Sequence, residues 1–239
     1  MEILRYKTVS STNTLAHEYA KKHGVDAPTV FVAEGQTAGR GRRGRSFESA
    51  DGVGLYISFL FKPDEKTATP ADITIRAAVA VVRALKLSFG IDADIKWVND
   101  IFYGGKKLGG ILAEGDVSED GSLSFAVLGI GVNLLKRNFS DEVSRIATTV
   151  EDIIGSPPDK ARFEEALISE FFGILSEDSV ISEYKKSQIA LGKTVEVRKI
   201  SGESFFARAV DITDGGELVV LREDGTSEAL FSAEISIRI

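Results

Sequence analysis

The residues best suited to chemistry lie in a short run that interleaves arginine with glycine. From position 39 to position 45 the chain reads Gly-Arg-Gly-Arg-Arg-Gly-Arg, within a protein that carries 29 Lys+Arg against 36 Asp+Glu and a formal net charge of −7. Arginine recognises phosphate or carboxylate through planar, bidentate hydrogen bonds, and glycine lets backbone amides approach a ligand closely. Guanidinium groups packed this closely repel one another unless an anion neutralises them. We therefore expect residues 39–45, the arginine loop, to close over a phosphorylated or adenylated small molecule.

Two other interpretations of the arginine loop are open, a nucleic-acid contact and a dinucleotide-binding fingerprint. Basic runs commonly contact nucleic-acid phosphates, but an acidic chain with no second basic run is poorly suited to follow a polyanion. The loop also satisfies G-x-G-x-x-G from Gly39 to Gly44, a pattern that requires a strand before it and a helix directly after it. A strand is predicted at 29–33, but polar residues 46–53 and a second strand at 55–61 follow. A small-molecule site is therefore favoured over both.

Composition excludes several classes of chemistry. The chain has no cysteine, which rules out a disulfide framework, a thiol nucleophile, a thiolate zinc site and an iron–sulfur cluster. Its two histidines, His17 and His23, fall on one predicted N-terminal helix, and we expect both to be exposed. No apolar run approaches the roughly 20 residues of a membrane helix, and the N-terminus lacks a secretory signal. These features predict a cytoplasmic enzyme without a membrane partner.

The elements that must position these groups can be predicted from capping and periodicity. A helix is predicted after residues 10–13, a polar Ser-Ser-Thr-Asn segment that can cap the helix, hold a ligand at its N-terminus, or do both. A second helix should run from about residue 69 to about residue 90. Strands are predicted at 94–98, 107–116 and 122–133, and hairpins join them. The sheet should therefore be mixed or antiparallel with helices on one face, which is an α+β fold.

The remainder of the chain divides into a helical stretch and a strand-rich end. Apolar residues recur every fourth position from Phe163 to Leu175, and a further helical stretch should run to about residue 189. Residues 193–239 contain short alternating runs separated by turn residues, a pattern typical of a small β-barrel. We therefore predict a catalytic domain over residues 1–188 and a small C-terminal domain over residues 189–239 that leans on it.

A second group of polar residues is predicted at the ends of neighbouring strands. Residues 96–100, Lys-Trp-Val-Asn-Asp, and residues 105–112 should form one polar-tipped hairpin, from which the Asn-Asp pair and Lys107 can project. The ordinary alternative is a turn at Asn-Asp and a solvated Lys-Lys tip. Gly129 and Gly131 lie within a predicted strand, which interior glycines weaken unless a ligand or another backbone must come close.

Taken in order, five segments resemble the catalytic region of biotin–protein ligases of the BirA type. They are Ser11-Thr12-Asn13, the arginine loop, Lys96-Trp97-x-Asn99-Asp100, Lys107-Leu108-x-Gly110-Ile111-Leu112 and Gly129-x-Gly131-x-Asn133. The match spans nearly the whole chain, and the strand-rich end is similar to the family's SH3-like C-terminal domain. Val98 stands in place of the usual proline and Phe47 in place of a frequent tryptophan, and both replacements are apolar. The chain begins at the catalytic region, without the winged helix-turn-helix of repressor members, so we expect no DNA binding.

The resemblance implies an ATP-dependent biotin–protein ligase that works in two half-reactions. The biotin carboxylate would attack the α-phosphate of ATP to give biotinyl-5′-AMP, and a lysine of a biotin carboxyl carrier domain would then attack the mixed anhydride. Neither step needs a nucleophile from the protein, which would instead position two mutually repelling anions and neutralise charge. The implied catalytic residues are Lys107, Arg42 and Asp100, of which Asp100 would orient or deprotonate the acceptor lysine.

The implied binding residues fall into two groups. The biotin group comprises Ser11, Thr12, Asn13, Gln36, Arg40, Gly41, Arg42, Lys107 and Gly110. The ATP and adenylate group comprises Arg42, Arg43, Arg45, Asn99, Lys107 and Asn133. Gly129 and Gly131 would let the ligand lie close to the strand. Mg²⁺ should accompany ATP, held largely by phosphates and water, and no protein ligand is assigned to it.

The implied partner is a biotin carboxyl carrier protein or domain of a biotin-dependent carboxylase or decarboxylase, and the resemblance also implies a homodimer. Three alternative functions remain. A lipoate–protein ligase shares the fold and the adenylation step, although the arginine loop and the Lys-Trp-x-Asn-Asp hairpin favour biotin. An octanoyl transferase of the same fold needs an acyl-carrying cysteine, which this chain lacks. A non-catalytic sensor of biotin or of a nucleotide would have little use for Lys107 and the loop arginines.

Overall fold

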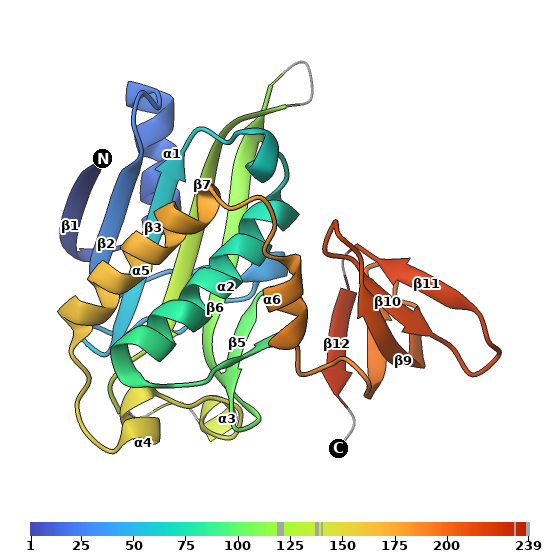
Figure 1. The fold of residues 1–239 in the computed structure, drawn as a ribbon. Helices are drawn as coiled ribbons and strands as arrows, with labels where there is room; N and C mark the ends of the chain where they lie inside the picture. Colours follow the sequence, from blue (N-terminus) through green and yellow to red (C-terminus); the bar gives the residue numbers. More distant parts are fainter. Residues whose placement is uncertain (119–121, 137–138, 140, 232, 238–239) are drawn as a thin grey trace.

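The computed structural model describes residues 1–118, 122–136, 139, 141–231 and 233–237, which form two β-sheets and a set of helices (Figure 1). The larger sheet has seven strands: β1 (Glu2–Val9), β2 (Thr29–Gln36), β3 (Gly54–Phe61), β4 (Asp94–Lys96), β5 (Asp100–Tyr103), β6 (Lys106–Val117) and β7 (Leu123–Asn133). Their order across the sheet is β1-β2-β3-β7-β6-β5-β4. β1 and β2 are parallel and the other neighbours are antiparallel, which confirms the mixed sheet of the predicted α+β fold.

Two long helices, α2 (Pro70–Phe89) and α5 (Lys160–Leu175), cover one face of this sheet (Figure 1). Small buried side chains such as Ala80 let α2 lie close to its neighbours, and Phe59 of β3 packs on Phe171 of α5 with ring centroids 4.5 Å apart. The main hydrophobic core therefore lies between these helices and the sheet. The shorter helices are α3 (Asp141–Ser144), α4 (Val150–Ile154) and α6 (Ile181–Lys186). No helix in the described ranges is both long enough and apolar enough to cross a membrane.

The helix α1 (Thr12–His23) packs on the opposite face, so the expectation of helices on one face of the sheet is incomplete. Phe31 of β2 and Leu60 of β3 join α1 in a separate buried cluster, whereas their neighbours along each strand face α2 and α5. The physical reason is β1, which is absent from the predicted elements. Parallel neighbours such as β1 and β2 cannot be joined by a tight hairpin, and α1 is the crossover between them. This placement brings the N-terminus of α1 to the face where the functional site lies.

The C-terminal strands form a separate antiparallel sheet, as predicted from their alternating pattern. Its strands are β8 (Thr194–Lys199), β9 (Ser204–Ile212), β10 (Leu218–Leu221), β11 (Ser227–Leu230) and β12 (Ala233–Ile237), in the order β11-β10-β9-β8-β12. The Trp97 indole N–H donates to the Gly216 carbonyl at 2.9 Å, and the hydrophobic core continues into this sheet. The small domain therefore packs against the larger one, as expected. The division after residue 188 falls between α6 and β8 and stays a prediction.

Candidate active site

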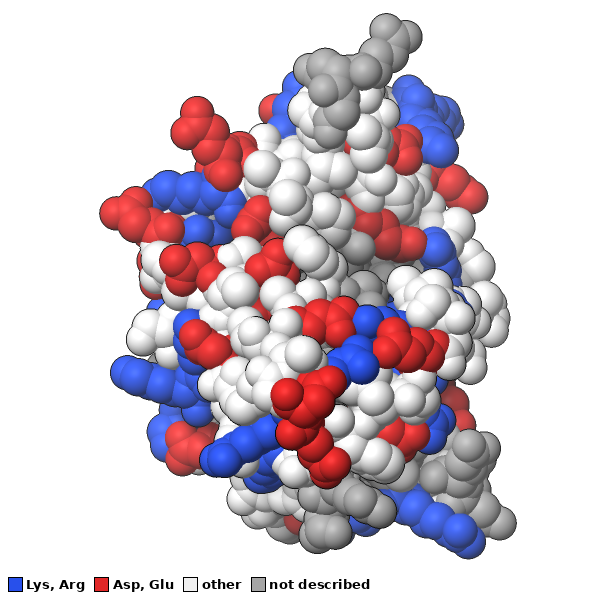
Figure 2. Space-filling view, turned by 90° about the vertical axis from the view of Figure 1, so that its right-hand side faces the viewer, with Lys and Arg blue, Asp and Glu red and all other residues white. Residues whose placement is uncertain are grey.

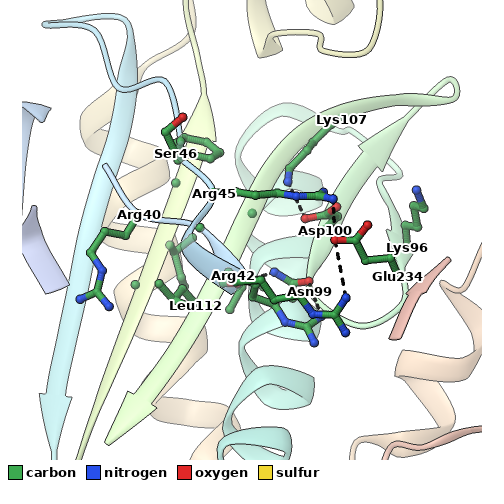
Figure 3. Close-up of a pocket in the computed structure, with 18 of the residues that line it drawn as sticks. Arg40, Arg42, Arg45, Ser46, Lys96, Asn99, Asp100, Lys107, Leu112 and Glu234 are labelled. Atoms are coloured by element: carbon green, nitrogen blue, oxygen red, sulfur yellow. Dashed lines mark hydrogen bonds and ion pairs between the residues drawn. The ribbon is translucent and has the colours of Figure 1, made fainter. Parts of the chain in front are cut away.

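One pocket of about 370 Å³ collects nearly all of the predicted site residues (Figure 3). It lies on the α1 face of the larger sheet, between the arginine loop and the C-terminal sheet. The predicted residues that line it are Ser11, Thr12, Asn13, Gln36, Arg40, Gly41, Arg42, Arg43, Arg45, Asn99, Asp100, Lys107 and Gly110. Asn133 is not among the lining residues. Its side chain is buried and donates to the Thr148 carbonyl at 3.2 Å, so its predicted contact with the nucleotide has no geometric support in the free protein.

The N-terminus of α1 forms the neutral end of the pocket. The backbone N–H and the hydroxyl of Thr12 both donate to Oε1 of Gln36, at 2.8 and 3.1 Å. The Gln36 amide nitrogen donates to the Ser49 hydroxyl at 2.9 Å, and that hydroxyl donates to the Phe47 carbonyl at 2.9 Å. Ser11 occupies the N-cap position, yet it makes no side-chain capping bond. The polar segment at the start of α1 therefore serves the pocket, and Gln36 satisfies a free N–H of the helix.

Asn13 is buried against β6 and β7. Its amide nitrogen donates to the Leu112 carbonyl at 3.3 Å and to a Glu114 carboxylate oxygen at 2.9 Å, and its amide oxygen accepts from the Ser58 hydroxyl at 2.7 Å. Gly129 makes room for this arrangement, because a Cβ there would lie 2.1 Å from the Asn13 amide oxygen. Gly129 also lines the pocket, so the expectation that a ligand lies close to this strand stays a prediction, and the glycine in addition makes room for the side chain of Asn13.

The resemblance implies that Asn13 binds biotin, and on that expectation Gly129→Ala should raise the KM for biotin at least about tenfold, equivalent to roughly 1.4 kcal/mol, with a smaller change in kcat. The added methyl group would overlap the Asn13 amide and push it out of position. Steady-state kinetics with varied biotin measure the effect. Gly173→Ala is the matched control, since a Cβ at this position in α5 meets nothing within 4 Å and alanine favours a helix. An unchanged KM in the Gly129 variant would contradict the expected contact between Asn13 and biotin.

Glycine geometry shapes the arginine loop into a short hairpin. Its two arms form an antiparallel bridge, and between them Arg43 and Gly44 take positive φ values of 58° and 73°. A Cβ at Gly39 would lie 2.4 Å from the Phe47 carbonyl oxygen, so only glycine lets the arms close. The ring of Phe47 then lies against β7, where a Cβ at Gly131 would come within 2.7 Å of it. The second glycine of β7 therefore also makes room for a side chain of the site.

Every arginine of the loop faces an oxygen atom of the protein, and Figure 3 shows two of these partners, Asn99 and Glu234. The pairs in chain order are Arg40 with Glu114 at 2.6 Å, Arg42 with Asn99 at 3.2 Å, Arg43 with Glu234 at 3.6 Å and Arg45 with Glu234 at 2.5 Å. Two carboxylates, from β6 and β12, therefore neutralise part of the charge of the four loop arginines in the free protein, and a bound anion would neutralise more of it. Closure of the loop over a phosphorylated or adenylated ligand stays a prediction.

Lys107 and Asp100 form an ion pair at the charged end of the pocket, with Nζ and Oδ1 2.6 Å apart (Figure 3). Both come from the predicted hairpin, Asp100 from the start of β5 and Lys107 from the start of β6. Gly110 keeps the space beside the ammonium open, since a Cβ there would lie 3.4 Å from Nζ. The tip of the hairpin, residues 103–106, is an exposed turn, whereas Asp100 and Lys107 behind it form a pair of charges at the pocket wall.

The charged end of the pocket is partly desolvated. Burial lowers the pKa of Lys96, which also lines the pocket, and the nearby Asp100 carboxylate opposes this effect. Burial likewise lowers the pKa of Arg42, and the neighbouring positive charge of Arg43 adds to it. An anion bound here would stabilise the charged forms of both side chains. The site is therefore electrostatically prepared for a carboxylate or a phosphate.

Four contributing residues were not assigned from the sequence: Glu114, Glu234, Ser58 and Lys96. Two of them carry a local signal, because period-two alternation puts Glu114 on the face of the site and Ser58 is a lone hydroxyl in an apolar strand. Glu234 comes from the C-terminal sheet and carries none. His17, expected to be exposed, is only 20% exposed and lies 4.0 Å from Glu114.

Comparison with known proteins places the chain in one family. The model of the biotin/lipoate A/B protein ligase family matches residues 6–133, more than half of the chain. The model of the biotin protein ligase C terminal domain matches residues 190–238.

Individual relatives cover almost the same range. The bifunctional ligase/repressor BirA of Bacillus spizizenii is 32% identical over 237 residues, which cover 96% of this chain and 72% of that protein. The biotin–[acetyl-CoA-carboxylase] ligase of Mycobacterium tuberculosis is 29% identical and covers 79% of this chain and 71% of its own length. The solved structure of a biotin protein ligase from Aquifex aeolicus with biotin and ATP has a TM-score of 0.83 at 28% identity, over 99% of this chain and 98% of that one. This chain therefore belongs to the biotin/lipoate A/B protein ligase family, and its last strands form a biotin protein ligase C-terminal domain.

Proposed function

We propose that this pocket activates biotin with ATP and transfers it to a lysine of a biotin carboxyl carrier domain. The observation that supports this most directly is that one pocket joins two chemically different ends. The neutral end at Thr12, Asn13 and Gln36 offers the hydrogen-bonding groups that a buried ureido ring needs. The charged end at Lys107 and Arg42 suits a carboxylate beside a phosphate.

In the first half-reaction a carboxylate oxygen of biotin would attack the α-phosphorus of ATP. A new P–O bond forms as the bond to pyrophosphate breaks, which gives biotinyl-5′-AMP. Lys107 would lie between the two anions and neutralise both, and Arg42 would contact the phosphate. Arg43 and Arg45 would also bind the ATP phosphates, which would compete with Glu234 for these two side chains. The closed arginine loop would keep water from the mixed anhydride.

In the second half-reaction the acceptor lysine amine would attack the biotinyl carbonyl carbon, and AMP leaves as the amine loses a proton. An ordinary lysine pKa of about 10.4 leaves little free amine at neutral pH, so a nearby carboxylate is useful. Asp100 suits this role, because its contact with Lys107 would weaken once ligand anions engage that lysine. Its carboxylate would then be available to orient or deprotonate the incoming amine.

Magnesium would enter as the complex with ATP, held by phosphate oxygens and water. Among the described residues no group of three or more His, Cys, Asp and Glu side chains gathers to hold a metal ion. The carboxylates among the described lining residues, Asp100 and Glu234, are both paired with cations. We therefore assign Mg²⁺ to the nucleotide and not to protein ligands.

We further propose a homodimer, with a carrier domain of a carboxylase or decarboxylase as acceptor and no nucleic-acid partner. β1 is an edge strand whose unpaired backbone groups are available to a second copy. On the side that Figure 2 shows, acidic and basic side chains alternate over the described residues instead of forming the broad basic surface that suits nucleic acid. Sedimentation velocity measures the oligomeric state, and a DNA titration at low salt measures nucleic-acid binding.

Pyrophosphate release from MgATP with biotin, lipoate or octanoate tests the central proposal. We expect release with biotin, biotinyl-5′-AMP on the protein by mass spectrometry, and transfer to a purified carrier domain. Pyrophosphate release with lipoate alone would support the adenylation step but would mean that the substrate is lipoate and not biotin. Biotin binding without pyrophosphate release would indicate a sensor and contradict the proposed activity.

A further inference from the structure

Glu114 of β6 contacts both the biotin-binding residues and the arginine loop, although it is not among the residues that line the pocket. Its Oε2 accepts from the amide nitrogen of Asn13 at 2.9 Å, and its Oε1 accepts from Arg40 at 2.6 Å. The side chain is 22% exposed, and His17 Nε2 lies 4.0 Å from Oε2. One carboxylate on a rigid strand therefore holds two groups that the site needs in place.

The charge on Glu114 determines which way the Asn13 amide points. The two ends of an amide have nearly the same shape, so hydrogen bonding decides between them. With its nitrogen toward Glu114, the amide also donates to the Leu112 carbonyl and accepts from Ser58. The reverse orientation would place the amide oxygen against a carboxylate and a carbonyl, both of which are acceptors. A glutamine at position 114 would weaken this preference, because it offers a donor as well as an acceptor and leaves only the Leu112 carbonyl to oppose the reversed amide.

The same hydrogen-bond network reaches the other end of the arginine loop. From Asn13 it continues to the Ser58 hydroxyl, whose single proton is shared between the Asn13 amide oxygen and the Thr12 hydroxyl, each 2.7 Å away. The Thr12 backbone N–H then donates to Gln36, which is linked through Ser49 to the Phe47 carbonyl. Arg40 lies at the start of the loop and Phe47 just beyond its end. Both ends of the loop are thus tied to one network, and that network contains the predicted ligands of biotin. A change in the orientation of the Asn13 amide would therefore disturb the hydrogen bonds at both ends of the loop.

We propose that Glu114 is a positioning residue that couples biotin binding to closure of the arginine loop. The proposal rests on the proposed biotin site. Glu114 orients Asn13 for the ureido ring and at the same time holds Arg40 in the closed hairpin. Loss of its charge would weaken biotin binding and loosen the loop together, while the adenylating groups around Lys107 keep their contacts.

The substitution Glu114→Gln tests the proposal, because it preserves size and removes the charge. We expect the Kd for biotin, measured by calorimetry, and the KM for biotin to rise at least about tenfold while kcat stays within about threefold. Trypsin cleaves after arginine and reports on how often the loop opens, so it should cut the loop of the variant at least about three times faster. A merely structural role would lower the melting temperature without separating KM from kcat.

The matched control is Asp116→Asn, on the same strand two residues further, where the carboxylate pairs with Lys21 at 3.8 Å outside the network. Its biotin affinity and tryptic rate should equal those of the wild type. In the double variant of Glu114→Gln with Arg40→Ala, the losses of affinity should combine to less than their sum.

Two outcomes separate failure of this inference from failure of the proposed function. A folded Glu114→Gln variant with wild-type biotin affinity and tryptic rate would overturn the role of Glu114. Absence of biotin binding in the wild type would overturn the biotin site itself. If Glu114→Gln does not fold, Glu114→Asp replaces it, because the shorter side chain keeps the charge but cannot reach both partners, and the same changes are expected.

Discussion

Replacing Lys107 by alanine is expected to lower kcat/KM for biotin-dependent pyrophosphate release about 10³-fold, equivalent to roughly 4 kcal/mol. The reaction brings a carboxylate against a phosphate, and Lys107 is the cation that the proposed geometry places between them. Its side chain is 33% exposed, so its charge is less screened than that of a surface lysine. With alanine at this position, the repulsion between the carboxylate and the phosphate is not compensated by a cation. Stopped-time assays of pyrophosphate with saturating MgATP measure the loss.

The hairpin provides its own control for this substitution. Lys106 precedes Lys107, is exposed, and has Nζ 3.5 Å from the Ser144 carbonyl. Lys106→Ala should therefore retain activity within about twofold, since a surface contact of this kind contributes little. Loss of the partly exposed ion pair with Asp100 should change the stability of the Lys107 variant by no more than about 1 kcal/mol, so both variants should fold. Equal activities in the two variants would exclude Lys107 from the chemistry.

The parts of the fold that could be predicted are those with local signals. Thr69 and Asp72 form a capping box and Gly90 takes a left-handed φ of 70°, so three residues define the limits of α2. β1 could not be predicted in this way, because most of its residues are exposed at the sheet edge and no apolar run marks it. Without β1 there was no crossover, and the face that α1 occupies could not be inferred. The sequence pattern thus determines elements more readily than their placement.

The same distinction applies to the candidate site. Residues at the ends of predicted strands and in the arginine loop do converge on one pocket, because their positions follow from hairpins that can be read locally. The partners of these residues are distant in the chain. Arg40 meets Glu114, 74 positions away, and Arg45 meets Glu234 of the last strand. The sequence therefore indicated where cations gather, whereas their counterions became apparent only in three dimensions.

Arg42→Ala is expected to be the most damaging substitution in the arginine loop, with kcat/KM for ATP lowered about 10²-fold. Arg42 is half-buried and donates to Asn99 at 3.2 Å, toward the charged end of the pocket (Figure 3). Burial lowers its pKa from the ordinary range of arginine, yet the side chain stays protonated at neutral pH. A cation that is already partly desolvated loses less hydration when it binds phosphate, and its field is less screened. The variant should also release biotinyl-5′-AMP into solution, where mass spectrometry of the protein-free filtrate detects it.

Arg45→Ala is the informative comparison, because it removes the same charge from an exposed position. The Arg45 side chain is 69% exposed and pairs with Glu234 at 2.5 Å. Water therefore screens its charge, and a carboxylate is already paired with it. We expect a loss in kcat/KM for ATP of no more than about fivefold, in line with the small energies of exposed ion pairs. Equal losses in the two variants would mean that the number of positive charges, and not their desolvation, determines how the loop acts on ATP. A large difference would mean that the loop acts on ATP mainly through an arginine that burial has already partly separated from water.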